Sequence, residues 1–169
     1  LGTGTLCAGL KREAYTTADI PDALASMKRL NNVIDHLSTE SGIHAATDIT
    51  GFGLAGHGMQ MARASDVTLT IQCARLPLFA LTLASHEVGH TTKAHRSNAE
   101  YTAQGLRFHE AVSPLMRLVT YDPQTSGGLL LSVAPADADR IVRELAPVFP
   151  GVSIIGGVGA PGPHRVVVE

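Results

Sequence analysis

One aspartate stands among hydroxyl and glycine residues where an extended segment gives way to a helix. The stretch is T-D-I-T-G-F-G, residues 47–53, and two more glycines follow at positions 56 and 58. Asp48 can bind Mg²⁺, because this ion takes one or two protein carboxylates together with waters and nucleotide phosphates. Thr47 and Thr50 can orient the carboxylate. The alternative is that Asp48 or Thr50 caps the helix, since both types are favoured N-caps.

A second stretch, D-P-Q-T-S-G-G at residues 122–128, runs directly into the apolar segment 129–133. Asp-Pro favours a turn, and the two glycines let the chain bend sharply into a strand. One interpretation is a fixed turn against an active-site cleft. The other is direct contact of Thr125 or Ser126 with a nucleotide.

The motifs T-D-I-T-G-F-G-L-x-G-H and D-P-Q-T-S-G-G-L-L-L together resemble the C-terminal half of selenophosphate synthetase (selenide, water dikinase). The opening L-G-T-G-T, residues 1–5, is similar to the start of that half. The resemblance implies that Asp48 is a metal ligand of a composite active site. It also implies a nucleotide-binding wall made from nearby residues, namely Thr47, Thr50, Gly51, Phe52, Gly53, Thr125 and Ser126.

The same resemblance implies an enzyme that makes selenophosphate, AMP and phosphate from selenide, ATP and water, with Mg²⁺ and ATP bound at the site. In that family the N-terminal half supplies the reactive Cys or Sec, a lysine and further metal-binding aspartates. We therefore expect residues 1–169 to be a single C-terminal domain of a two-domain enzyme that is catalytically silent alone. A homodimer is expected for the full-length protein.

Two alternatives stay open at this stage. One is another enzyme of the aminoimidazole ribonucleotide synthetase-like superfamily, such as that synthetase, thiamine monophosphate kinase or a hydrogenase-maturation protein. The other is a stand-alone binding or assembly domain without chemistry of its own.

The eight histidines invite a metal interpretation that their spacing does not favour. His57 lies among glycines and alanines, which is typical of a packed, hydrogen-bonded core residue. The spacings of His86, His90, His95 and His109 match no zinc signature and no cysteine joins them, so solvated loop histidines are expected.

Composition narrows the class of protein. In this chain of 169 residues, 44% are hydrophobic and 17% are charged, which suits a globular core. The net charge of −2 argues against a nucleic-acid partner. No apolar run reaches the roughly 20 residues of a membrane span, and the isolated Cys7 and Cys73, expected to be buried thiols, indicate the cytosol.

The elements that must position these residues follow from periodicity. We expect strands over residues 1–10, 43–49, 66–72 and 128–133, and helices over 20–37, 54–64, 76–89 and 135–148. Residues 90–105 are predicted to be a surface loop and 106–119 short extended pieces around Pro114. Residues 152–158 and 165–168 are predicted to form a hairpin.

This alternation of strands and helices predicts an α+β fold with a mixed, largely antiparallel sheet. The resemblance implies a layered α/β/α sandwich of the aminoimidazole ribonucleotide synthetase-like C-terminal domain type.

Overall fold

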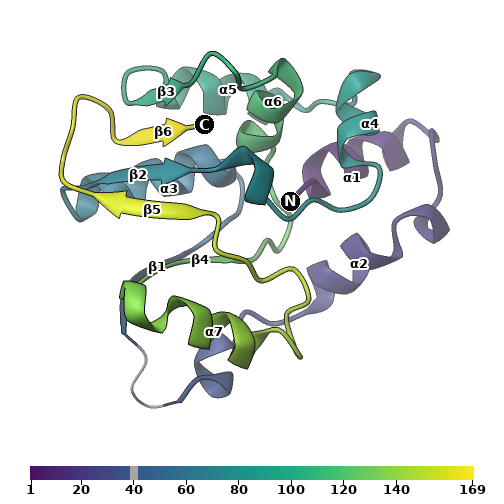
Figure 1. Cartoon of the computed structure of the whole chain (residues 1–169). Coiled ribbons are helices and arrows are strands. Elements are labelled where there is room, and N and C mark those ends of the chain that lie inside the picture. The colour runs from purple at the N-terminus through teal and green to yellow at the C-terminus, as the bar shows by residue number, and fades with distance from the viewer. Residues whose placement is uncertain (39–41) are drawn as a thin grey trace.

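The computed structural model of the chain describes residues 1–38 and 42–169, and it holds two β-sheets among helices (Figure 1). The smaller sheet pairs β1 (Ile43–Asp48) antiparallel with β4 (Leu129–Val133). The larger sheet has the order β3-β6-β2-β5, with bounds Leu106–Phe108, Val166–Val168, Thr68–Ile71 and Gly156–Gly159. Strand β5 is antiparallel to β2, whereas β6 is parallel to β2 and β3. The α+β class with a mixed sheet is confirmed, and its antiparallel ladders are the longer ones.

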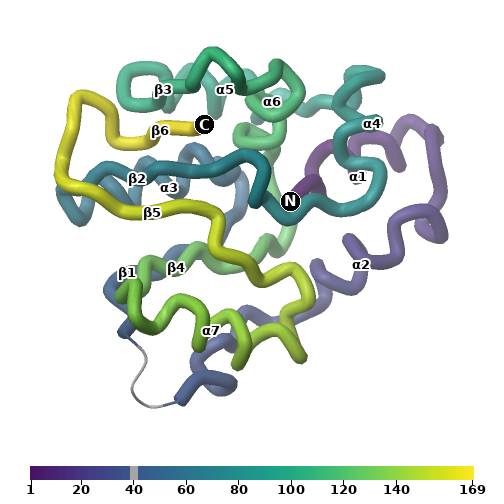
Figure 2. The backbone as a smooth tube through the Cα atoms, in the orientation of Figure 1, coloured from purple at the N-terminus to yellow at the C-terminus, as the bar shows by residue number. Residues whose placement is uncertain are grey.

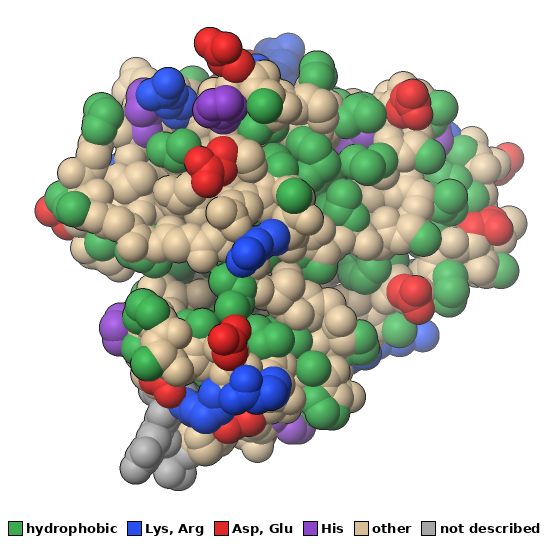
Figure 3. Space-filling model, viewed as in Figure 1, with side chains coloured by type: hydrophobic (Ala, Val, Ile, Leu, Met, Phe, Trp, Pro, Cys, Tyr) green, Lys and Arg blue, Asp and Glu red, His purple; other side chains and the backbone are tan. Residues whose placement is uncertain are grey.

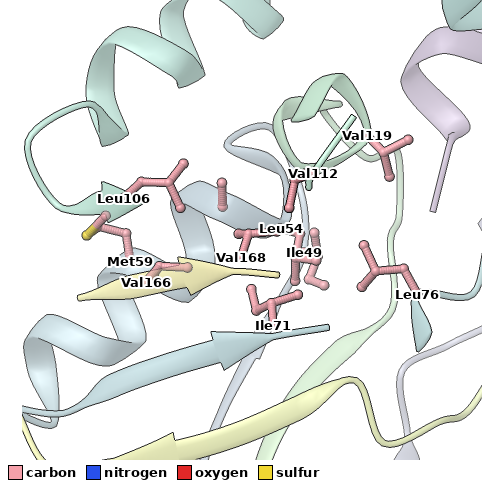
Figure 4. Close-up of a cluster of buried hydrophobic side chains, with 11 residues drawn as sticks. Ile49, Leu54, Met59, Ile71, Leu76, Leu106, Val112, Val119, Val166 and Val168 are labelled. Carbon is pink, nitrogen blue, oxygen red and sulfur yellow. The ribbon is translucent and has the colours of Figure 1, made fainter. Parts of the chain in front are cut away.

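Helix α3 (Gly53–Ala64) lies at the centre and contacts β1, β2 and β6 as well as two helices, α5 and α6. Its first seven residues are all buried, and its glycines and alanines let neighbouring elements approach closely. Each fully buried large apolar side chain here contributes about 1.5–3 kcal/mol. Figure 4 shows the resulting core, in which side chains from α3 meet Ile49, which follows β1, and side chains of the larger sheet: Leu54, Met59, Ile71, Val166 and Val168.

Helix α7 (Ala138–Leu145) covers the face of the small sheet that is turned away from α3. Its buried Ile141 and Leu145 pack on Leu129 and Leu131 of β4, whereas Leu130 packs on the α3 side. Strand β4 is thus covered on both faces, as its unbroken apolar run predicts. Within the part of the chain that the structure describes it pairs only with β1, so it is an edge strand and not a central one.

The remaining helices lie along the top and the right-hand side of the molecule in the view of Figure 2. They are α1 (Thr3–Lys11), α2 (Pro21–Lys28), α4 (Thr82–Glu87), α5 (Lys93–Thr102) and α6 (Pro114–Tyr121). Short 3-10 turns occupy Thr17–Asp19, Val33–His36, Cys73–Arg75 and Pro135–Asp137. Among the described residues, no helix has the length and apolarity that crossing a bilayer requires.

Helix α1 (Thr3–Lys11) occupies most of residues 1–10, so the strand predicted there is wrong. Every residue from Gly2 to Leu6 is buried, so alternation of small and apolar types does not mark one face of a strand. The first backbone N–H groups of the helix find acceptors on side chains more than a hundred residues away, at Asp122 and Gln124. No local pattern carries that information.

The surface loop predicted for residues 90–105 is also wrong, because α5 lies there. A capping box between Thr92 and His95 starts the helix. Its buried residues are His95, Asn98 and Thr102, which follow helical spacing but are polar. A search for apolar periodicity cannot detect a helix that buries polar side chains.

In residues 106–119 the extended pieces are confirmed only for β3. Ser113 caps α6 by accepting a hydrogen bond from the N–H of Met116, and Pro114 occupies the first turn. Proline therefore starts this helix instead of interrupting a strand, in keeping with its tolerance at that position.

Three further boundaries differ from expectation. The helix predicted over 20–37 ends at Lys28, where Arg29 takes an extended conformation, and a 3-10 turn follows. The helix expected from residue 76 begins at Thr82. Strands β5 and β6 do not pair as a hairpin, because β2 lies between them; the all-valine β6, with Val166 and Val168 fully buried, occupies an interior position. Strands β1 and β2 and helix α7 lie where they were predicted, with shorter ends, and helix α3 begins one residue earlier than predicted.

Candidate functional site

The two glycine-rich motifs are joined by backbone hydrogen bonds at the end of the small sheet. Asp48 lies opposite Leu129 in the β1–β4 ladder. Just beyond it, the N–H of Ile49 donates to the carbonyl of Gly128 at 2.9 Å, and the N–H of Gln124 donates to the carbonyl of Thr50 at 2.9 Å. Residues 47–53 and 122–128 therefore form one contiguous surface, although about 75 residues separate them in the sequence.

Two glycines are required by this junction. A Cβ on Gly127 would lie 2.1 Å from the carbonyl oxygen of Ile49, which no substitution can accommodate without moving backbone. Gly53 has a φ of +66° and lies against the backbone of residues 120–122, so a side chain would be both strained and crowded. Asn98 of α5 closes the arrangement by donating to the carbonyls of Gly51 and Tyr121, both at 2.9 Å.

The second motif also holds the start of the chain. The Gln124 side-chain oxygen accepts from the N–H of Gly2 at 3.0 Å and of Thr3 at 3.3 Å, and Asp122 Oδ2 accepts from the N–H of Gly4 at 3.2 Å. These are the N–H groups that a helix leaves without intrahelical partners. The α1 N-terminus is thus capped by the turn motif, which ties L-G-T-G-T to the same junction.

Asp48 presents its carboxylate at the surface of this junction. Strand β1 alternates half-buried and exposed positions, and Asp48 is on the exposed face. Helix α3 begins after Phe52 with no side-chain cap, so the interpretation of Asp48 or Thr50 as its N-cap is wrong. Across residues 1–38 and 42–169, no hydrogen bond or ion pair engages the Asp48 carboxylate.

The flanking hydroxyls do not orient that carboxylate. Thr47 Oγ1 donates to the backbone oxygen of Asp48 at 3.3 Å, and Thr50 Oγ1 is 3.1 Å from Nε2 of His57. The prediction that His57 is a packed, hydrogen-bonded core residue is confirmed. Burial lowers the pKa of His57, and the nearby charge of Asp48 opposes that change.

The other predicted nucleotide contacts divide into exposed and buried positions. Gly51, Phe52, Thr125 and Ser126 are exposed, and the Phe52 ring packs beside the ring of Tyr101 with centroids 5.3 Å apart. Thr47 and Thr50 are half-buried, whereas Gly53 lies inside. Thr125 is held by its N–H, which donates to Thr3 Oγ1 at 2.8 Å, so its side chain stays at the surface.

Three of the histidines expected in a solvated loop are buried, so that prediction is wrong for His86, His90 and His95 and holds only for the exposed His109. Burial lowers the pKa of His86 to about 4. His95 Nε2 lies 3.1 Å from a carboxylate oxygen of Asp122, the first residue of the turn motif. Sequence spacing could not bring these residues together, because α5, which carries His95, was not predicted.

Cys7 and Cys73 are unpaired and half-buried, not fully buried as expected. Burial raises the pKa of both thiols, and for Cys7 the charge of Asp122 raises it further. Cys7 borders a hollow of about 340 Å³ whose wall also includes Gly4, Lys11, Thr92 and Thr125.

Comparison with known proteins places this geometry in a family context. The family described as "AIR synthase related protein, C-terminal domain" matches residues 1–169. A selenide, water dikinase from Bdellovibrio bacteriovorus is 51% identical over 160 residues, covering 94% of this chain and 45% of that protein. One from Nitrosomonas eutropha is 49% identical, covering 94% and 46%. The chain thus spans about half the length of the curated relatives it matches.

Among solved structures, the crystal structure of hydrogenase maturation protein HypE is similar, with a TM-score of 0.59 at 17% identity, covering 94% of this chain and 41% of that one. A structure of hydrogenase maturation protein HypE in complex with ATP has a TM-score of 0.52 at 19% identity, covering 83% and 36%. At these identities the likeness concerns the fold alone.

Proposed function

Because this chain belongs to the family of the AIR synthase related protein C-terminal domain, we propose that it is the C-terminal half of a selenide, water dikinase. The full-length enzyme would make selenophosphate, AMP and phosphate from selenide, ATP and water. Residues 1–169 would form one domain of it, and the reactive Cys or Sec and the remaining metal ligands would come from the other half.

The observation that carries the proposal is the surface carboxylate of Asp48 at the junction of the two motifs. Among the described residues it has no hydrogen-bonding partner, although the backbone around it is tied to residues 122–128 on one side and to α3 on the other. A carboxylate on a rigid backbone with free oxygens fits one of the few protein ligands that Mg²⁺ takes beside nucleotide phosphates.

Each part of this surface has a role in the proposed site. Asp48 would hold Mg²⁺, which when bound neutralises charge on the phosphates of ATP. The exposed Gly51 and Phe52 on one strand end and Thr125 and Ser126 on the other would line the nucleotide cleft. Gly53, Thr47 and Thr50 would act by shaping the backbone, since they are wholly or partly buried.

Two further features belong to this proposal. The enzyme would be cytosolic, which the two unpaired cysteines support, because disulfides are rare there. It would also be a homodimer in its full-length form.

The test replaces Asp48 by Asn in the full-length protein. Asn has nearly the same shape but no charge, so Mg²⁺-dependent AMP formation should fall severely, whereas the melting temperature without Mg²⁺ and ATP should barely change. Asp66→Asn is the matched control: Asp66 is exposed, pairs with Arg165 at the surface, and Asn tolerates its φ of +50°. Its turnover and stability should stay close to those of the unchanged protein.

Normal turnover with normal Mg²⁺ dependence in Asp48→Asn would remove Asp48 from the site. The 169-residue chain alone should form no AMP above background, and selenide-dependent AMP formation by it would overturn the proposal of a divided site. The coding sequence upstream of Leu1 separates the enzyme from a stand-alone binding domain, because the proposal requires a glycine-rich segment followed by Cys or Sec and Lys.

A further inference from the structure

Three potential metal ligands meet in the interior between helices α4, α5 and α6. They are His86 on α4, His95 on α5 and Asp122 just after α6, and their side chains are 3%, 5% and 0% exposed. One ligand atom from each lies within 4.8 Å of the other two. Helix α4 packs on α6, and α6 packs on α5, so this cluster joins three elements that Figure 1 shows at one end of the molecule.

Within residues 1–38 and 42–169, four polar atoms of this cluster lack hydrogen-bond partners. Neither ring nitrogen of His86 has one, and the same holds for His95 Nε2 and Asp122 Oδ1. The last two atoms are 3.1 Å apart, but they are not aligned as donor and acceptor. An unsatisfied buried polar group costs about 1–3 kcal/mol, so a cluster with four such atoms needs a physical explanation.

The Asp122 carboxylate and the His95 ring are held in place by hydrogen bonds to their other polar atoms. Asp122 Oδ2 accepts from the N–H of Gly4 and from Nε2 of Gln124, which leaves Oδ1 directed toward the histidines. The N–H of Thr92 donates to His95 Nδ1 at 3.1 Å, and Thr92 Oγ1 lies 3.2 Å from the same nitrogen. A cation bound at Nε2 would require the tautomer with its proton on Nδ1, which would then donate to Thr92 Oγ1. Outer partners of this kind orient the ligands in metal sites.

We propose that His86, His95 and Asp122 bind one Zn²⁺ ion that joins α4 and α5 to the D-P-Q-T-S-G-G turn. Two histidine nitrogens and a carboxylate oxygen are common zinc ligands. Ligand atoms about 2.0 Å from a tetrahedral zinc lie about 3.3 Å from one another. The separation of His95 Nε2 and Asp122 Oδ1 already matches this value, and His86 would have to move by at most about 1.5 Å.

The burial of all three ligands keeps this ion apart from the proposed site at Asp48, which lies on the exposed face of β1. With three ligands from the protein, a water molecule would fill the fourth position of a tetrahedral ion.

The test uses the 169-residue chain after its metal has been removed with a chelator. Zn²⁺ is added back, unbound metal is dialysed away, bound zinc is measured by mass spectrometry, and thermal unfolding is followed by circular dichroism. One zinc per chain and a higher melting temperature are expected, because a ligand that binds only the folded state stabilises it. Co²⁺, whose visible spectrum reports its ligands, gives a readout independent of stability.

His86→Phe separates the metal site from a plain packing role. Phenylalanine fills the same space without ring nitrogens, so the metal-free variant should melt at the same temperature or higher. Its zinc affinity should fall by more than the roughly 10–100-fold that loss of an outer partner costs, and zinc should no longer raise its melting temperature. His109→Phe is the matched control, because His109 is exposed and outside the cluster, and it should retain the metal.

Two outcomes would overturn the proposal. Wild-type chain that keeps no zinc after dialysis would mean that the cluster is a buried polar network without a metal. Equal zinc retention by the wild-type chain and His86→Phe would mean that the ion binds elsewhere, at exposed side chains.

Discussion

Gln124 is the side chain on which the junction of the three motifs depends most. It is buried, its Oε1 accepts from the N–H groups of Gly2 and Thr3, and its Nε2 donates to the backbone oxygen and to Oδ2 of Asp122. Gln124→Leu keeps a similar volume but removes every one of these bonds. Two buried backbone donors of α1 lose their acceptor, and the Asp122 carboxylate loses one of its donors.

The size of the stability loss in Gln124→Leu follows from these lost hydrogen-bond partners. Each unsatisfied buried donor costs about 1–3 kcal/mol, so two of them cost about 2–6 kcal/mol, and entry of water at the end of α1 favours the lower half of that range. We expect the free energy of unfolding to fall by about 3 kcal/mol. For a chain of this size that corresponds to a melting temperature lower by roughly 6–12 °C.

The assay is urea unfolding followed by circular dichroism, with Gln104→Leu as the control. Gln104 is exposed after α5, so its substitution should change the free energy of unfolding by less than about 0.5 kcal/mol. Gln124→Glu adds a second test: it keeps an acceptor for α1 but faces the carboxylate of Asp122. The loss in free energy of unfolding that Gln124→Glu causes should become smaller as the pH falls, because the introduced Glu is then protonated and the folded state binds that proton more tightly than the unfolded state does. A loss below about 1 kcal/mol in Gln124→Leu would refute the reasoning.

Three further predictions concern the same chain. Gly127→Ala should lower the free energy of unfolding by about 2 kcal/mol, because its Cβ would meet backbone atoms. Gly128→Ala should be nearly neutral, because a Cβ there would meet no atom of the described residues within 4 Å. Equal effects of the two substitutions in urea unfolding would contradict this prediction. The free energy of unfolding should decrease as pH falls below 6.5, because the pKa of His57 is lowered in the folded chain and the unfolded chain therefore takes up a proton first. In His57→Gln this decrease should be shallower. If urea titrations at several pH values show the same dependence of the free energy of unfolding on pH in both proteins, His57 makes no such contribution. The chain should self-associate weakly, since Leu30 and Ile34 are 76% and 65% exposed and Figure 3 shows further apolar side chains on the face of the molecule that it draws. In sedimentation experiments the double variant Leu30→Glu, Ile34→Glu should be more monomeric than the unsubstituted chain. A strict monomer of the unsubstituted chain at high concentration would count against this prediction.

The sequence by itself determined the elements whose apolar pattern is local. The alternation in β2, the unbroken run of β4, the helical spacing in α7 and the glycine-rich α3 all lie where the sequence predicts them, because the pattern that specifies each element lies within its own residues. The two motifs were also recognisable from the sequence, since turn chemistry and glycine requirements are written in residue types.

Only the tertiary structure decided where polar groups find partners across long separations. Helix α1 is helical because Gln124 and Asp122 satisfy its first N–H groups, and α5 is a helix whose buried face is His95, Asn98 and Thr102. Apolar periodicity does not register such faces, so both segments were predicted wrongly. Hydrogen bonding between distant groups is a property of the folded chain, and for that reason the His86, His95 and Asp122 cluster was beyond prediction from spacing.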